Sequence, residues 1–233
     1  MNHMTGKSTV TQTVARTLQE MIRSGELRKD EKIPSQRILS EQLQVSRASL
    51  REALLTLETI GLVRTLPARG TFVTGTEVPT DAGQQSWRFD GQFTIRDVFQ
   101  SRLLIETELC RLAAPHMTSA IADRLHQATQ QFEDAWNAGD LVTHVEADLT
   151  FHGLIVETCP NAMLRQLYQS VRDKMTESQR VPIPNTAVAR MSGSISEHRS
   201  ILEGLRQRDP VQAAAAMAAH IRNTAACAGV SLA

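Results

Sequence analysis

The stretch "PSQRILSEQLQVSRASLREALLTLETIGLVRT", residues 34–65, decides the fold of the first part of the chain. Ser35 can cap a helix that runs to about Leu43, because a serine hydroxyl accepts a hydrogen bond from a free N–H group of the first helical turn. Ser46 can cap a second helix in the same way, and Gly61 can end it. We therefore expect two helices joined by a short turn.

The sequence on either side of this helix pair completes a small domain. Upstream, apolar residues recur at helical spacing over residues 9–24, which predicts a preceding helix. Downstream, the β-rich segments "LVRTL" and "GTFVT" are separated by "PARG", whose proline and glycine favour a turn. Three helices and a hairpin predict a winged helix-turn-helix domain over residues 9–74. We expect residues 1–8, which precede this pattern, to be disordered.

The rest of the chain has a different pattern. Residues 75–93 lose hydrophobic periodicity and gather Gly, Pro, Gln and Asp, which predicts a linker. Residues 94–228 are helical in pattern almost throughout, with breaks at short segments that contain Pro or Gly. The expected helices are, roughly, 94–114, 119–138, 140–158, 161–179, 187–208 and 210–227. The sequence thus predicts a mainly α protein whose C-terminal domain is an all-α antiparallel helical bundle.

Composition narrows the class of protein. The chain has 233 residues and 41% hydrophobic residues, which is enough to bury a core. Its three cysteines, Cys110, Cys159 and Cys227, form no CxxC pair, which argues against a disulfide framework and against a thiolate zinc site. The start of the chain lacks the apolar segment of a signal peptide, and no run of apolar residues is long enough to span a membrane. We therefore expect a cytoplasmic protein without a membrane segment.

Arginines lie near the start of the second helix of the pair. Arg47 and Arg51 are four residues apart, at the end of the helix that enters a major groove in helix-turn-helix proteins. Ser46 is placed to cap this helix and to contact a phosphate. Arginine can bind guanine O6 and N7 through two hydrogen bonds. The alternative is that both arginines are solvated surface residues.

Residues 9–74 as a whole resemble the N-terminal domain of the GntR family of bacterial transcription regulators, because the helices, the turn and the wing "ARGTFV" follow in order at the family's spacing. The resemblance implies DNA-contacting roles for arginines of this domain. It also implies that a glycine lets the wing backbone approach the minor groove. The expected DNA-binding residues are Arg37, Ser46, Arg47, Arg51, Arg69 and Gly70.

Residues 148–152, "DLTFH", suggest a metal site in the second domain. Asp148 and His152 are four apart and share the apolar face of their helix, and His198 and His220 lie on apolar faces of later helices. A carboxylate that faces a core must be paired, hydrogen-bonded or coordinated. Three imidazoles and one carboxylate from a helical bundle can hold one metal ion, although each histidine alone could be an ordinary core residue. His144 lies beside the same face and could compete as a ligand.

Arg102 is a further inward-facing charge, and Glu106 follows it one helical turn later. One interpretation is a structural pair between these two side chains. The other is that the guanidinium binds the carboxylate of a ligand through two hydrogen bonds, which lysine could not reproduce.

Four segments of the second domain, "VFQSRLLIETELCRLAA", "DLTFHGLIVE", "EHRSILEGLRQRD" and "MAAHIRN", resemble the FCD domain, the ligand-binding domain of one GntR branch. Metal-containing members carry an Asp, a His four residues later and two further His, a pattern that Asp148, His152, His198 and His220 match. Arg102 matches a ligand-contacting arginine of that family. The resemblance implies a dimerisation domain with one divalent transition metal ion per chain. Three imidazole ligands disfavour calcium and magnesium, which leaves zinc first, then nickel, cobalt or manganese.

Together these features predict a ligand-responsive regulator of transcription. We expect a homodimer on palindromic operator DNA that responds to a small organic acid or sugar acid. The family resemblance alone implies that it is a repressor which this ligand releases. One alternative is a metal-dependent enzyme fused to a DNA-binding domain, but HExxH, GxSxG, Walker and Rossmann glycine patterns are all missing from the sequence. The other alternative is a constitutive DNA-binding dimer whose metal ion is purely structural.

Overall fold

The computed structural model describes residues 5–66, 69–74, 87, 91–182 and 188–232. The chain divides into two compact units, Met1–Gln84 and Gln85–Ala233. The division falls within the predicted linker 75–93, most of which lies outside the described residues. Each unit is considered by itself below.

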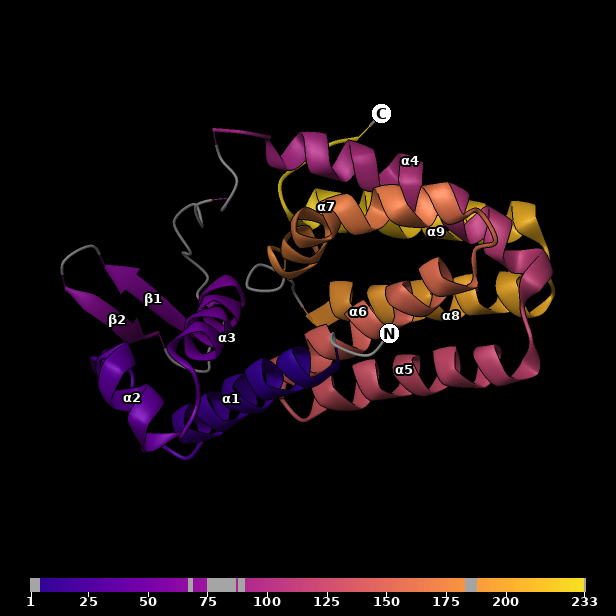
Figure 1. The fold of residues 1–233 in the computed structure, drawn as a ribbon. Coiled ribbons are helices and arrows are strands. Elements are labelled where there is room, and N and C mark those ends of the chain that lie inside the picture. The colour runs from indigo at the N-terminus through magenta and orange to yellow at the C-terminus, as the bar shows by residue number, and fades with distance from the viewer. Residues whose placement is uncertain (1–4, 67–68, 75–86, 88–90, 183–187, 233) are drawn as a thin grey trace. The chain divides into compact units, whose positions relative to one another are not determined.

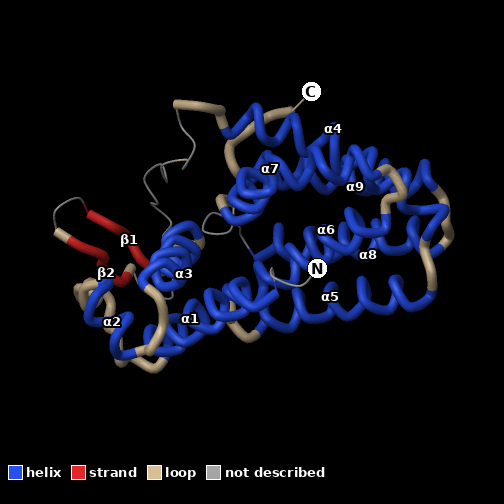
Figure 2. The backbone as a smooth tube through the Cα atoms, viewed as in Figure 1, coloured by secondary structure: helices blue, strands red, loops and turns tan. Residues whose placement is uncertain are grey.

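The first unit consists of three helices followed by a two-stranded antiparallel sheet (Figures 1 and 2). α1 packs against α3, and α3 also contacts α2 and β1. Apolar side chains between them, among them Leu18, Leu50 and Leu57, are fully buried. The elements are α1 (Thr5–Arg23), α2 (Gln36–Gln42), α3 (Arg47–Thr59), β1 (Val63–Leu66) and β2 (Gly70–Val73). The predicted winged helix-turn-helix is therefore confirmed.

Both predicted serine caps are present in this unit. Ser35 Oγ accepts a hydrogen bond from the backbone N–H of Ile38 at 3.4 Å, and Ser46 Oγ accepts one from Ser49 at 3.0 Å. α1 begins at Thr5, four residues before the start of the predicted helix at residue 9. Once a helix has formed, each added residue contributes a hydrogen bond, so a helix can extend beyond its last apolar residue.

The wing needs glycine at one position. Gly70, the first residue of β2, has a φ of +108°, and a Cβ there would lie 2.7 Å from Lys32 Cε. The segment that contains Lys32 lies along β2, because the Ile33 N–H donates to the Thr71 carbonyl oxygen at 2.9 Å. The positive φ favours a residue without Cβ, whereas the Lys32 side chain could move to make room for one.

The second unit is helical in nearly all of its described residues. α9 packs against α4 and α8, and α5 packs against α6 and α8, as Figure 1 shows. Phe99, Phe151 and Leu205 belong to the core enclosed by these helices. The elements are α4 (Ile95–Ala113), the 3-10 turn η1 (Ala114–His116), α5 (Ser119–Asn137), α6 (Leu141–Thr158), α7 (Ala162–Arg180), α8 (Val188–Arg206) and α9 (Pro210–Cys227). The predicted all-α helical bundle is confirmed.

Helix boundaries in the second unit follow local capping signals. Thr94, Thr118, Asp140, Asn161 and Asp209 each accept a hydrogen bond from the first turn of the helix that follows. Capping of this kind satisfies backbone N–H groups that have no partner inside the helix. None of the helices in the described part of the chain is both long and apolar enough to cross a lipid bilayer.

The backbones of α8 and α9 come into close contact at Gly204, where an added Cβ would lie 2.7 Å from the Ala213 nitrogen and 2.9 Å from its Cα. We predict that Gly204→Ala lowers the free energy of unfolding by about 1–3 kcal/mol, because backbone atoms would have to move. Gly153→Ala in α6 is the matched control, because its Cβ would meet no atom within 4 Å. That change should stabilise the helix by about 0.5–1 kcal/mol. Thermal or denaturant unfolding measures both, and destabilisation by both changes would contradict the prediction.

Candidate metal centre and DNA-binding surface

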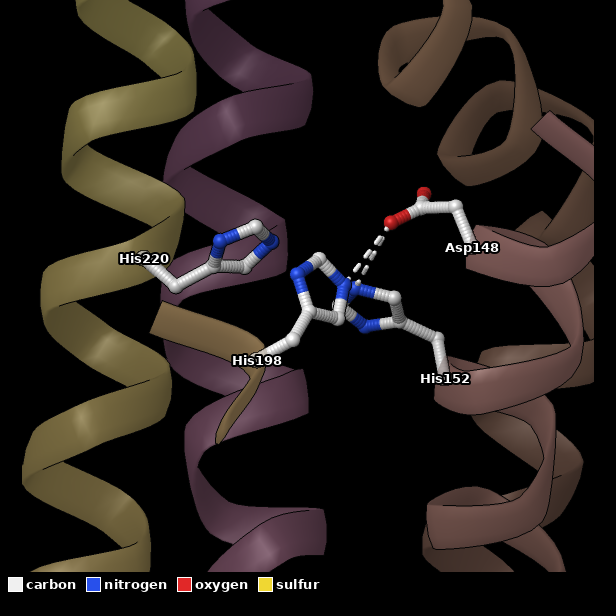
Figure 3. Close-up of side chains that lie close together, drawn as sticks. All are labelled: Asp148, His152, His198 and His220. Atoms are coloured by element: carbon white, nitrogen blue, oxygen red, sulfur yellow. Dashed lines mark hydrogen bonds and ion pairs between the residues drawn. The ribbon is translucent and has the colours of Figure 1, made fainter. Parts of the chain in front are cut away.

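Four side chains meet inside the second unit: Asp148 and His152 from α6, His198 from α8 and His220 from α9 (Figure 3). Each offers one ligand atom, and these atoms all lie within 4.8 Å of one another. The three imidazoles are buried, and Asp148 is partly buried. The structure thus brings together the four residues that the sequence analysis selected, although they span three helices.

Two of these imidazoles lie against glutamates outside the cluster. His220 Nδ1 and Glu197 Oε2 are hydrogen-bonded at 2.9 Å. His152 Nδ1 lies 2.6 Å from Glu106 Oε2, a close contact that does not have the geometry of a hydrogen bond. A carboxylate at this distance attracts the imidazole proton to Nδ1 and leaves the lone pair on Nε2 for an ion. Carboxylates in this position also fix the orientation of the ring.

The third imidazole provides a direct test of whether a cation fits. His198 Nδ1 lies 2.9 Å from the carbonyl oxygen of Ser194, which can only accept, so this nitrogen donates. His198 Nε2 lies 3.0 Å from Asp148 Oδ1 (Figure 3). When Nδ1 carries the only proton, a lone pair on Nε2 faces a carboxylate oxygen, and a cation bound by both atoms removes the repulsion. Neither ring nitrogen of the buried His152 has a hydrogen-bond partner among the described residues, so Nε2 is free to bind an ion. The four residues therefore form a candidate metal site.

Burial and charge set the protonation of this site. Burial lowers the pKa of His220 to about 4, which keeps the ring neutral near pH 7. Burial alone would raise the pKa values of Glu106 and Asp148. For Glu106 the charge of Arg102 and the proximity of His152 outweigh burial and lower the pKa to about 2. For Asp148 the contact with His198 and the proximity of the other histidines hold the pKa well below its usual value. Neutral imidazole and ionised carboxylate are the forms that bind metal ions.

His144, the alternative ligand, does not join the cluster. Its Nδ1 lies 2.9 Å from the carbonyl oxygen of Phe132, and its ring stacks on the Phe132 ring at a centroid distance of 3.9 Å. Burial lowers the pKa of His144 to about 4. It is therefore a satisfied core histidine.

Arg102 is fully buried, and its guanidinium is only partly used within the protein. Its Nε donates to Glu106 Oε1 at 2.7 Å, and its Nη1 lies 3.5 Å from Ser178 Oγ. Its Nη2 has no hydrogen-bond partner among the described residues. The structure therefore contains the Arg102–Glu106 pair that the sequence offered as one interpretation, and it leaves a donor for a ligand.

A small cavity adjoins the cluster and is lined by Arg102, Asp148, Gln179, Arg190 and His220, among others. Its volume of about 40 Å³ has room for a few water molecules. Arg102 and Arg190 place two guanidinium groups at this cavity.

Each of these arginines is joined to the metal cluster through a glutamate. Arg102 binds Glu106 at 2.7 Å, and Arg190 Nη2 donates to Glu197 Oε2 at 2.9 Å. The same two glutamates lie next to Nδ1 of two histidines of the cluster. A ligand that contacts either arginine would therefore act one side chain away from a glutamate that touches a candidate metal ligand.

Glu197, Arg190 and Gln179 also belong to this site, and none of them was predicted from the sequence. Glu197 precedes His198 directly, yet its contacts are with His220 and with the Asn223 amide of α9. Only the packing of α8 on α9 reveals them.

The DNA-binding residues expected from the sequence lie in α2, at the start of α3 and in the wing. Arg47 begins α3 and Arg51 follows one turn later, and both side chains are exposed. Arg37 is exposed on α2 and pairs with Glu41 at 3.1 Å, a surface contact that DNA could replace. Arg69 is exposed at the wing. The set comprises Arg37, Ser46, Arg47, Arg51, Arg69 and Gly70.

This combination, a winged helix-turn-helix unit followed by a helical unit with a buried cavity, defines a class of regulatory protein, and comparison with known families agrees. The model described as "Bacterial regulatory proteins, gntR family" matches residues 10–73. The FCD domain model matches residues 97–223. The chain belongs to the GntR family of bacterial regulatory proteins and carries an FCD domain.

Similar proteins are named as transcription regulators. The transcriptional regulator LutR of Bacillus subtilis is 29% identical over 87% of this chain and 94% of that protein. The transcriptional repressor NanR of Citrobacter rodentium is 27% identical over 97% of this chain and 87% of that protein. The Escherichia coli protein McbR/YncC shares the fold, with a TM-score of 0.54 at 19% identity over 93% of this chain and 95% of that one. The protein is thus a DNA-binding transcription regulator and not an enzyme.

The hydrogen bond between Glu197 and His220 can be tested by mutation. Glu197→Ala should weaken metal affinity by about 10–100-fold, because His220 loses the carboxylate that orients it. Competition with a coloured chelator measures the affinity. The control is Glu203→Ala, an exposed glutamate on the same helix that contacts Gln207. Equal metal affinity of the two variants would mean that Glu197 does not support a metal ligand.

Proposed function

We propose that this regulator represses transcription and leaves its operator when a small carboxylate binds beside a metal ion in the helical unit. The observation that carries the proposal is the unpartnered Nη2 of the buried Arg102, which lines the same cavity as Asp148 and His220. A buried guanidinium nitrogen without a partner is costly, and a carboxylate is the group that it binds best. The protein would act in the cytoplasm as a homodimer on palindromic DNA.

The proposed metal is one divalent transition ion per chain, held by Asp148, His152, His198 and His220. Imidazole ligands favour zinc, nickel, cobalt or manganese over calcium and magnesium, and we place zinc first. Such an ion supplies a Lewis-acid contact for an oxygen atom of the effector. Arg102 orients the same effector by binding its carboxylate.

Charge balance supports a single carboxylate as the effector group. Arg102 and Arg190 are offset by Glu106 and Glu197, which leaves Asp148 as the remaining anion at the site. When the imidazoles are neutral, a divalent ion added to the single negative charge of Asp148 gives the site one net positive charge. One effector carboxylate neutralises that charge, and burial strongly favours neutrality.

DNA recognition is assigned to the first unit. Arg47 and Arg51 would read base edges in the major groove, because they are exposed at the N-terminal end of α3. Arg37 and Ser46 would contact phosphates. The wing would approach the minor groove with Arg69 and Gly70.

For this assignment we predict that Arg47→Ala weakens operator binding by about 1–3 kcal/mol per half-site, the usual cost of losing a base contact made by two hydrogen bonds. Gel-shift titration with operator DNA measures the loss. Titration with DNA of unrelated sequence is the control, and there the affinity should change little. A phosphate contact would instead weaken both complexes and reduce the salt dependence.

The effector site is tested by Arg102→Lys, which keeps a positive charge beside Glu106 but loses the planar guanidinium. Calorimetry with a panel of organic and sugar acids, followed by gel shifts, measures the response. We expect metal content and ligand-free operator affinity near wild type. Effector binding should weaken by about 1.5–3 kcal/mol. Arg111→Lys, an exposed arginine of α4 that pairs with Glu108, is the control.

Two results would refute the proposal. A wild-type response in the Arg102→Lys variant would show that the arginine is structural. If no acid changes the operator affinity of the wild-type protein, the metal ion and the cavity serve structure alone.

A further inference from the structure

Gln179 is a buried polar side chain to which neither the metal site nor the Arg102 contact assigns a purpose. It lies near the end of α7, is 6% exposed and lines the cavity beside the cluster. Neither its amide nitrogen nor its amide oxygen has a hydrogen-bond partner among the described residues. Buried amides are nearly always hydrogen-bonded, so an unpaired one that lines a cavity calls for a partner that arrives with a ligand.

The chemistry of an amide narrows that partner. An amide oxygen accepts and an amide nitrogen donates, whereas a carboxylate only accepts and a guanidinium only donates. Arg102 therefore suits the carboxylate of the effector. Gln179 suits a different, neutral group of the effector, one that can both donate and accept. A hydroxyl group has both properties.

The other charged side chains of the cavity suit this group less well. Arg190 donates through Nη2 to Glu197 at 2.9 Å, and its buried Nε, which has no hydrogen-bond partner among the described residues, can only donate. The carboxylate of Asp148, whose Oδ1 lies 3.0 Å from His198 Nε2, can only accept. A second carboxylate on the effector would meet charges that are already balanced. The cavity of about 40 Å³ also favours a compact molecule.

We infer that Gln179 recognises a hydroxyl group of the effector, so that the effector is a small hydroxy acid whose carboxylate lies at Arg102. The inference rests on the proposed function, because it takes the ligand of the cavity to be a carboxylate. Arg102 then selects molecules that carry a carboxylate, and Gln179 selects among those acids for one that also carries a hydroxyl group.

The experiment compares acids that differ by one hydroxyl group. Metal-loaded protein is titrated in a calorimeter with glycolate against acetate and with 2-hydroxybutanoate against butanoate. For the wild type we expect the hydroxy acid to bind about tenfold tighter in at least one pair, the difference that one net hydrogen bond makes. Gln179→Met, which keeps the approximate volume and removes both polar atoms, should lower that ratio by about tenfold. Gln169→Met, on an exposed position of the same helix, should leave it unchanged.

Thermal unfolding of the ligand-free protein separates recognition from a structural role. Gln179→Met removes a buried amide without partners, so the variant should unfold at the wild-type temperature or higher. A residue that holds the fold through its amide would instead give a lower temperature and would contradict the inference. Should methionine prevent folding, Gln179→Leu offers a second apolar replacement for the same titrations.

The outcomes distinguish the inference from the proposed function. If an acid binds through Arg102 while Gln179→Met keeps the full preference for the hydroxyl group, or if the wild type shows no such preference, the inference fails and the proposed function stands. If no acid of a wider panel binds at all, the proposed function fails and the inference fails with it.

Discussion

The electrostatics of the helical unit depend on one buried carboxylate, that of Glu106. It lies 2.7 Å from Arg102 Nε through one oxygen and 2.6 Å from His152 Nδ1 through the other. A buried charge is tolerated only when it is paired, and removal of one partner leaves the other uncompensated. The carboxylate therefore fixes a cavity arginine and a candidate metal ligand at the same time. A ligand that draws Arg102 away also changes the charge that His152 feels.

Glu197 repeats this arrangement on the other side of the cluster, between Arg190 and His220. The two glutamates make the cavity and the metal cluster parts of one network. Under the proposed function, a ligand at the cavity would act on the metal site through these glutamates, and such coupling is what a ligand-responsive regulator requires. A coupling of about 1–3 kcal/mol suffices for regulation. By the inference made above, the small cavity and the unpaired amide of Gln179 would make this network selective for a compact acid that carries a hydroxyl group.

Most of the fold could be predicted from the sequence, because its signals are local. Capping residues such as Ser46, Thr94 and Asp209 mark helix starts within a few positions of the predicted ones. The start of α1 at Thr5 could not be predicted, because no capping or apolar signal marks it. The spacing of Asp148 and His152 is visible in one helix.

The rest of the candidate site depends on contacts between helices, which periodicity does not encode. Glu197 acquires its partners only because α8 packs on α9, and Arg190 joins them from an earlier turn of α8. Gln179 lies near the polar end of α7, where the sequence looks like a solvated surface, and only burial against the cavity distinguishes it.

The donors of the candidate metal site are separated by long stretches of chain, 50 residues from Asp148 to His198. An ion held by them joins distant parts of the chain in the folded state alone, in a protein whose cysteines are all free thiols. By mass action such an ion stabilises the folded chain in proportion to the logarithm of its free concentration. The cellular supply of the ion would then influence how much regulator survives proteolysis, and so the abundance of the protein as well as its response.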